Sequence, residues 1–143
     1  MNKDPELDRE IVLKKLDELA EDRVFLRNYV DKGLKWILED KSRTYAFERA
    51  MHRALESILD ICKHFVTSLE LGVVMSYSEY PKRLAEANYM DKELAETISN
   101  LAKLRNVLVH RYAELNYDLL FKEAKNLVEN VIPAFSEWVK RQL

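Results

Sequence analysis

Residues that interrupt helices are scarce in this chain. Two glycines and three prolines among 143 residues are less than half of the roughly 12% that these two residue types usually contribute. Few turns can therefore be built, and we expect long helices. The single cysteine, Cys62, rules out an internal disulfide framework.

Other absences narrow the class of protein. There is no run of about 18 apolar residues, so we expect no transmembrane helix, and the charged start MNKDPELDRE lacks the apolar core of a signal peptide. With the single cysteine, this favours a cytoplasmic protein.

The sequence has no Cys/His cluster, no G-x-S-x-G and no glycine-rich loop, which argues against a zinc enzyme, a serine hydrolase and a phosphate-loop protein. We therefore expect no metal and no cofactor. A net charge of -2 means that any basic patch for nucleic acid must be local.

The apolar residues predict an all-α protein, an antiparallel four-helix bundle with an additional short helix, in a single domain over residues 1–143. The first helix is expected from about Pro5 to Asp40. Its broad core face consists of Val12, Leu13, Leu16, Leu19, Ala20, Leu26, Val30, Leu34, Ile37 and Leu38. A second, narrower apolar stripe on the far side is covered by another helix of the chain or forms a subunit interface; it consists of Ile11, Phe25, Tyr29 and Trp36.

The second helix is expected to begin near Thr44 and to stop at Gly72, a residue suited to a helix C-terminus. Its core side consists of Phe47, Ala50, Met51, Ala54, Ile58, Ile61, Cys62, Phe65 and Leu69. The opposite side carries charges of both signs, at Arg49, Arg53, Glu56, Asp60 and His64. Such a stripe is usually a solvated surface with weak ion pairs.

Three further helices are predicted. A short one runs from Pro81 to about Asn88, and a longer one follows Asp91, a plausible N-cap. The last begins after Asn116, and Pro133 is expected to kink it. The fourth helix turns Leu94, Leu101, Leu104, Leu108 and Leu115 to the core, and the last one turns Leu120, Ala124, Leu127, Val131, Phe135 and Trp138 inward.

The fourth helix contains the most unusual stretch of the chain, LRNVLVHRY. At helical spacing, Arg105 and Tyr112 lie together at the edge of the apolar face, and Asn106 and His110 form a second pair one turn apart. Two interpretations are open. In the structural one, Arg105 requires a carboxylate partner, and the second helix provides one at Glu56 or Asp60.

The chemical interpretation assigns this stretch to phosphodiester cleavage. His110 can exchange a proton near neutral pH, and Arg105 offers a fixed fork of donors to phosphate oxygens. Asn106, one turn before the histidine, can hold the ring or contact a phosphate. Cleavage without a metal needs a proton-transfer group and a stabiliser of charge on phosphorus, and these residues include both.

The same stretch matches the R-x4-H-x-Y motif of HEPN-domain proteins. More narrowly, the chain resembles the HepT-like toxins, helical ribonucleases paired with minimal nucleotidyltransferase antitoxins. The resemblance covers nearly the whole chain, including FERAMHRALESILDICKHFV and the segment from SYSEYPKRL to NYDLLF. One departure is Asn88, where relatives often carry Gly.

The resemblance implies a function and its partners. It implies a metal-independent RNA endonuclease that acts as a homodimer, with two Arg105 and two His110 around one RNA backbone at a cleft, and with Asn106 among the catalytic residues. It also implies that the antitoxin silences the toxin by adenylylation of Tyr112. Phosphate on that tyrosine would occupy the site beside Arg105.

Two other function classes stay open. The first alternative is a HEPN module that binds nucleotides or partners a nucleotidyltransferase without cleaving RNA, and the second is a purely structural helical protein. The joint presence of Arg105, Asn106, His110 and Tyr112 favours the enzyme, because a scaffold does not need all four.

Overall fold

The computed structural model describes residues 8–110 and 115–143, without the side chain of His110. The described ranges contain no strand. Their helices are α1 (Arg9–Lys32), α2 (Leu34–Leu38), α3 (Lys41–Ser68), α4 (Glu79–Glu86), α5 (Lys92–His110), α6 (Tyr117–Asn126) and α7 (Ile132–Gln142), with a π-helical turn, Leu127–Val131, between the last two.

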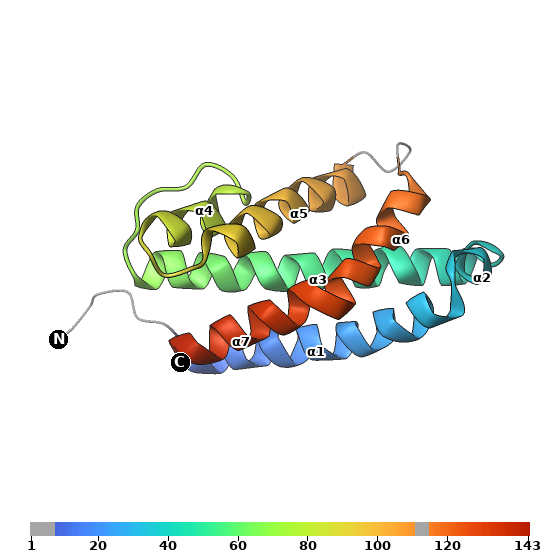
Figure 1. Ribbon diagram of the computed structural model, residues 1–143, viewed down its shortest axis with the longest axis horizontal. Coiled ribbons are helices and arrows are strands. Elements are labelled where there is room, and N and C mark those ends of the chain that lie inside the picture. The colour runs from blue at the N-terminus through green and yellow to red at the C-terminus, as the bar shows by residue number, and fades with distance from the viewer. Residues whose placement is uncertain (1–7, 111–114) are drawn as a thin grey trace.

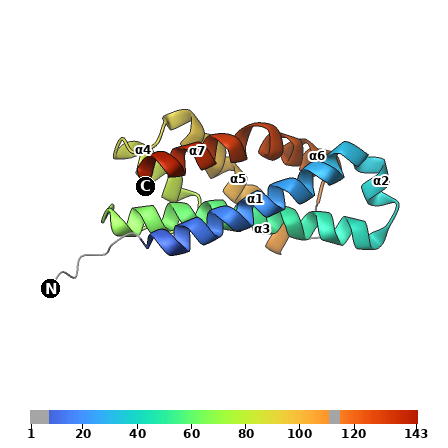
Figure 2. The ribbon, with the colours of Figure 1, turned by 90° about the horizontal axis from the view of Figure 1, so that it is seen from below.

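The long helices alternate in direction. In Figure 1, α1, α3, α5 and the α6–α7 pair run back and forth along the long axis, and α4 lies across one end. Figure 2 shows α1 crossing α3 obliquely and separating from it toward α2, and the two helices are in contact. The predicted fold, an all-α antiparallel four-helix bundle with an additional short helix, is confirmed; α2 is a second short helix that the prediction did not include.

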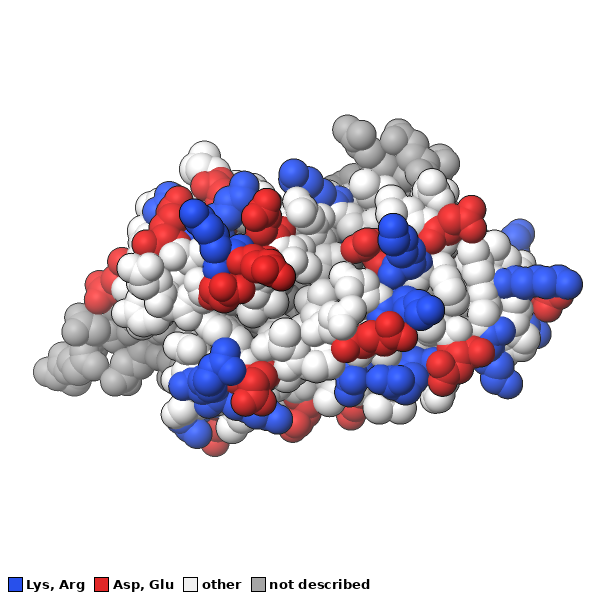
Figure 3. Space-filling model, viewed as in Figure 1, with Lys and Arg blue, Asp and Glu red and all other residues white. Residues whose placement is uncertain are grey.

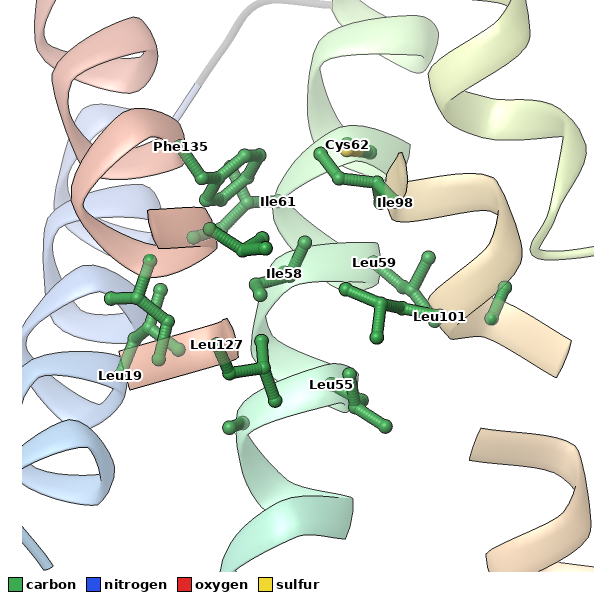
Figure 4. Packing of buried hydrophobic residues seen from close by; sticks show 14 of the residues in the cluster. Leu19, Leu55, Ile58, Leu59, Ile61, Cys62, Ile98, Leu101, Leu127 and Phe135 are labelled. Atoms are coloured by element: carbon green, nitrogen blue, oxygen red, sulfur yellow. The ribbon is translucent and has the colours of Figure 1, made fainter. Parts of the chain in front are cut away.

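The core lies around α3, which is in contact with α1, α2, α4 and α5. Figure 4 shows side chains from α1, α3, α5, the π-helical turn and α7 pointing toward one another. The predicted core residues of α3 are buried except for the half-buried Leu69. Leu55, Leu59 and Val66 are buried as well, because α5 and α4 cover α3 on a further side.

The prediction of one first helix up to Asp40 is wrong at Gly33. Gly33 has a φ of 95°, a conformation that favours glycine, and the chain turns there from α1 into α2. The helix begins after Asp8, whose side chain caps the N–H of Ile11; Pro5 lies outside the described residues. Of the predicted core face, Leu13 and Leu38 are more than 40% exposed.

The aromatic stripe of the first helix packs within the chain. Phe25 stacks on Tyr29 at 4.4 Å between ring centres, and Tyr29 meets the edge of Trp36 at 5.1 Å. Arg43, from α3, lies over the Trp36 ring and donates to its backbone carbonyl. These rings are partly buried against the core, whereas Ile11 is 39% exposed.

The second helix begins and ends earlier than predicted. Asp40 caps its start at Lys41, and it ends at Ser68 rather than Gly72. Leu71 N–H donates to Val66 and Glu70 N–H to Thr67, with Glu70 in the left-handed conformation at a φ of 52°. This is a Schellman ending, and Glu70 occupies the position usually given to glycine.

The later boundaries follow the predicted capping residues. Asp91 accepts from the N–H of Leu94, and Asn116 accepts from that of Leu119. Asn88 has a φ of 65°, a conformation that glycine and asparagine adopt more readily than other residues. The short helix α4 starts at Glu79, two residues before the predicted start, and ends at Glu86.

The end of the chain departs from a regular helix near Pro133. In place of a simple kink, a π-helical turn precedes the proline, which accommodates the missing N–H and the crowding of the ring against the preceding turn. The predicted inward residues of this segment are all buried. Leu115, predicted on the fourth helix, lies outside any helix. No described helix combines the length and apolar composition that a membrane crossing requires.

Candidate active site

Arg105 lies on the second half of α5, at the side that faces α3. Its side chain is only 15% exposed, and its Nη2 donates to Glu56 Oε1 over 2.8 Å. The predicted carboxylate partner of Arg105 is therefore Glu56. Asp60, the other candidate, is 3.4 Å from Lys15 of α1 instead.

A second residue shares the same carboxylate oxygen. His52 Nε2 lies 3.1 Å from Glu56 Oε1, and His52 Nδ1 lies 3.1 Å from Arg49 Nη1. Burial opposes ionisation of Glu56, but its hydrogen bonds with Arg105 and His52, and their charges, hold its pKa below the usual range. Glu56 is therefore an anion at neutral pH and fixes one end of the Arg105 guanidinium.

Tyr77 supports the guanidinium from another side. It belongs to the segment before α4, and Arg105 lies over its ring at 4.9 Å from the ring centre. Tyr77 in turn meets the edge of Tyr80 at 5.9 Å. Burial, together with the charges of Asp60 and Glu56, raises the pKa of Tyr77, so that its phenol stays neutral. A cation over an aromatic face is stabilised by the electrons of the ring.

The exposed side of Arg105 faces Asn106. Arg105 Nη1 donates to Asn106 Oδ1 over 3.1 Å, and Asn106 itself is exposed. Arg105 Nε is buried and makes no hydrogen bond within the described part of the chain. A phosphate would thus meet Arg105 from the Asn106 side, by replacing or joining that amide.

The remaining motif residues can be placed only in part. His110 is the last residue of α5, five positions beyond Arg105, and its side chain is not described. The prediction for Tyr112 lies outside the described residues. Among the residues that are described, no group of three or more His, Cys, Asp or Glu is arranged to hold a metal ion.

The family model described as ribonuclease HepT-like matches residues 9–139. The chain belongs to the HepT-like ribonuclease family. A curated relative is the mRNA nuclease HepT of Shewanella oneidensis, 29% identical over 80 residues, which are 56% of this chain and 60% of that protein. The match thus spans less than two thirds of the relative.

Solved structures share the fold of this HepT-like chain at low sequence identity. A tri-AMPylated HEPN toxin of Shewanella oneidensis, in complex with an MNT antitoxin, aligns over 99% of both chains with a TM-score of 0.82 and 22% identity. The cytosolic protein YutE of Bacillus subtilis, of unknown function, aligns over 96% of this chain and 91% of its own with a TM-score of 0.80 and 18% identity.

Sequence reasoning missed two residues of the candidate site in this HepT-like chain. Tyr77 lies in a loop, where helical periodicity gives no information about position. His52 lies one turn before Glu56, and this i,i+4 spacing is a signal that could have identified it.

Across the face seen in Figure 3, positive and negative side chains are interspersed. No continuous basic surface is visible there, in agreement with a net charge of -2. On this face, an anionic ligand would therefore be bound by individual side chains rather than by a broad basic surface.

Proposed function

We propose that this chain is a metal-independent RNA endonuclease and the toxin of a toxin–antitoxin pair. The observation that carries the proposal is Arg105, which Glu56 and Tyr77 hold in place five residues before His110. Membership of the HepT-like ribonuclease family supports it, as does the relative named an mRNA nuclease. Residues 1–143 are proposed to form one HEPN-like domain.

The proposed reaction is an internal transesterification. One His110 accepts the proton of the ribose 2′-OH as its oxygen attacks phosphorus, and a second His110 donates a proton to the departing 5′-oxygen. The P–O5′ bond breaks as the 2′-O–P bond forms, leaving a cyclic phosphate and a free 5′-OH. Arg105 and Asn106 stabilise the charge on the phosphate oxygens. Glu56 acts as a positioning residue for Arg105; Asp60, paired with Lys15, is a more distant supporting residue.

Two copies of His110 require a homodimer with its two-fold axis near α5. The second half of α5 supports this arrangement, since none of its described apolar side chains is buried: Leu104, Val107 and Leu108 are half-buried, and Val109 is 38% exposed. A second copy packed on Leu104, Val107 and Val109, with Leu108 outside the contact, would bring both motif helices to one cleft.

The test is cleavage of defined RNAs by the purified protein with EDTA present. We expect the wild type to cut and His110→Ala to lose cleavage, with helical circular dichroism and melting temperature close to wild type. His64→Ala is the control and should keep most activity. Cleavage by His110→Ala at the wild-type rate would remove His110 from the mechanism. RNA binding without any cleavage would favour the non-catalytic nucleotide-binding or nucleotidyltransferase-partner module.

Regulation is proposed to act on Tyr112. The hydroxyl oxygen of Tyr112 attacks the α-phosphorus of ATP on a nucleotidyltransferase antitoxin, and pyrophosphate leaves. The solved AMPylated toxin with its antitoxin supports this proposal. Intact mass after incubation with the neighbouring nucleotidyltransferase and ATP should show added AMP on wild type but not on Tyr112→Phe, which should remain active. Equal modification of both proteins, or modification without loss of cleavage, would contradict it.

A further inference from the structure

A stripe of polar and aromatic side chains leads along α3 toward Arg105. Tyr45, Arg49, His52 and Glu56 follow one another at intervals of four, three and four residues, so they share one face of the helix. The first three, with Glu48 of α3 and Leu108 of α5, line a groove of about 240 Å³. We call this the α3–α5 groove. It lies beside the second half of α5, which carries the proposed reaction centre.

The groove is joined to Arg105 by hydrogen bonds. Because arginine only donates, Arg49 Nη1 must donate to His52 Nδ1 across their 3.1 Å contact. When the His52 imidazole is neutral, its proton then lies on Nε2 and is donated to Glu56 Oε1. The same oxygen accepts from Arg105 Nη2, so the groove and the phosphate-binding arginine form one connected network.

The side chains that face solvent suit a nucleotide. Tyr45 is 52% exposed, although an aromatic ring of this size gains free energy by being covered. Arg49 is exposed as well, and its guanidinium has donors beyond the one used by His52. An aromatic face beside a guanidinium is a combination that binds single-stranded nucleic acid, by base stacking and phosphate contact.

Glu48, the carboxylate that lines the groove, can also contact a nucleotide. Glu48 is only 7% exposed, and its Oε2 accepts from the Tyr117 hydroxyl over 2.6 Å. It lies largely beneath the surface, and its other oxygen can accept from a ribose hydroxyl or a base amino group. A phosphate suits Arg49, which offers exposed donors, and a base suits Tyr45, which offers an exposed ring.

We propose that the α3–α5 groove is a subsite for one nucleotide of single-stranded RNA, with its base stacked on Tyr45 and its phosphate held by Arg49. Tyr45 and Glu56 are about 16 Å apart along α3 at 1.5 Å per residue. The bound nucleotide therefore lies within a few nucleotides of the scissile phosphate. The inference rests on the proposed ribonuclease function, because it assumes that RNA reaches Arg105.

Binding and cleavage are measured separately in the test. In a His110→Ala background, fluorescence anisotropy gives the Kd for a short single-stranded oligoribonucleotide at several salt concentrations. Tyr45→Ala should weaken binding about tenfold through loss of one stacked base, and Tyr45→Phe should bind like the parent. Arg49→Gln should also weaken binding and lower the slope of log Kd against log salt by about 0.7, the value for one phosphate contact on a single strand.

Matched controls remove an exposed tyrosine ring and an exposed guanidinium that do not line the groove. Tyr89→Ala deletes another exposed tyrosine, which is 42% exposed, and Arg27→Gln removes an exposed arginine of α1; both should leave the Kd unchanged. If Tyr45→Ala binds RNA as Tyr89→Ala does, the subsite is disproved. A Tyr45→Ala protein that binds RNA normally but is modified poorly by the nucleotidyltransferase would assign the groove to the protein partner and overturn the proposal.

The results distinguish a failure of the proposed ribonuclease function from a failure of the proposed nucleotide subsite. If the parent binds RNA through Tyr45 and Arg49 but the wild type never cleaves it, the proposed function fails and the subsite stands. If the wild type cleaves and the Tyr45 and Arg49 variants bind as the parent does, only the subsite fails. If the His110→Ala parent binds no RNA, the subsite is overturned, whatever the cleavage assay of the wild type shows.

Discussion

In the first half of α5, from Lys92 to Lys103, the helix is held by the chain's own core. Ala95, Ile98, Leu101 and Ala102 are buried, and the buried Ser99 donates from its hydroxyl to the carbonyl of Ser78. In the second half, from Leu104 to His110, no described apolar side chain is buried. The polar contacts there are made by Arg105, with Glu56, Asn106 and the Tyr77 ring.

The two halves of α5 therefore have different roles: the first half stabilises the fold, and the second half carries the residues of the proposed reaction. Side chains of the first half anchor α5 to α3 and α4, which fixes the direction in which the second half projects. The second half is then free to present Arg105 and Asn106 at an edge of the bundle. Substitutions in the first half should therefore mainly lower the free energy of unfolding, and those in the second half should mainly reduce RNA binding and cleavage.

The largest expected effect on stability is that of Ile98→Ala. Ile98 is fully buried, and removing such a side chain leaves a cavity that typically costs about 2–5 kcal/mol. Denaturant unfolding should show this loss, while cleavage per folded molecule stays near wild type. Val109→Ala, in the exposed second half, should change the free energy of unfolding of a single chain by no more than about 0.5 kcal/mol, measured at a concentration where sedimentation shows a monomer. Equal losses for the two variants would contradict the division of α5 into a buried and an exposed half.

An intermediate effect on stability, with a large one on activity, is expected at Arg105. Its ion pair with Glu56 is half-buried, so Arg105→Ala should cost about 1–3 kcal/mol, between the ranges for exposed and buried pairs. Arg105→Lys should keep part of the RNA binding but lose most turnover, because a point charge cannot replace the two-pronged guanidinium. A large fall in melting temperature with an unchanged rate per folded molecule would make Arg105 a structural residue only.

The fold could be predicted to the extent that it depends on periodicity. The core faces of α3 and of the last helices follow from apolar spacing, and the capping residues Asp91 and Asn116 mark two helix starts. Gly33 and Glu70 mark where this reasoning failed. Around Gly33 the apolar pattern continues across the break, and at Glu70 a left-handed residue other than glycine ends the helix.

The site could be predicted less completely, because it depends on how helices pack. Periodicity places Glu56 and Asp60 on one stripe of α3, but the choice between them depends on the register of α5 against α3. That register is set by side chains such as Leu59 and Leu101, which meet in the core (Figure 4). Tyr77 reaches Arg105 from a loop, whose position depends on where α4 packs, and local sequence does not specify this.

The smallest expected effect is a pH dependence of stability that comes from Glu56. Burial opposes its ionisation, but Arg105 and His52 outweigh burial and hold its pKa below the ordinary 4.5. A lowered pKa in the folded state means that the charged form stabilises the fold. This contribution is complete above pH 4.5 and is lost as the pH falls through the lowered value. Glu56→Gln, which cannot ionise, should therefore lose less stability than wild type when the pH is lowered over that range.

Glu56→Gln has a matched control on the first half of α5. Glu96 is exposed, and Glu96→Gln removes the same charge where Arg105 does not reach. We expect its unfolding free energy to follow the wild-type pH curve, while the Glu56→Gln curve is flatter. Parallel curves for wild type and Glu56→Gln would mean that the contact with Arg105 adds no net stability. In that case Arg105 would be held by its packing against the Tyr77 ring rather than by the Glu56 carboxylate.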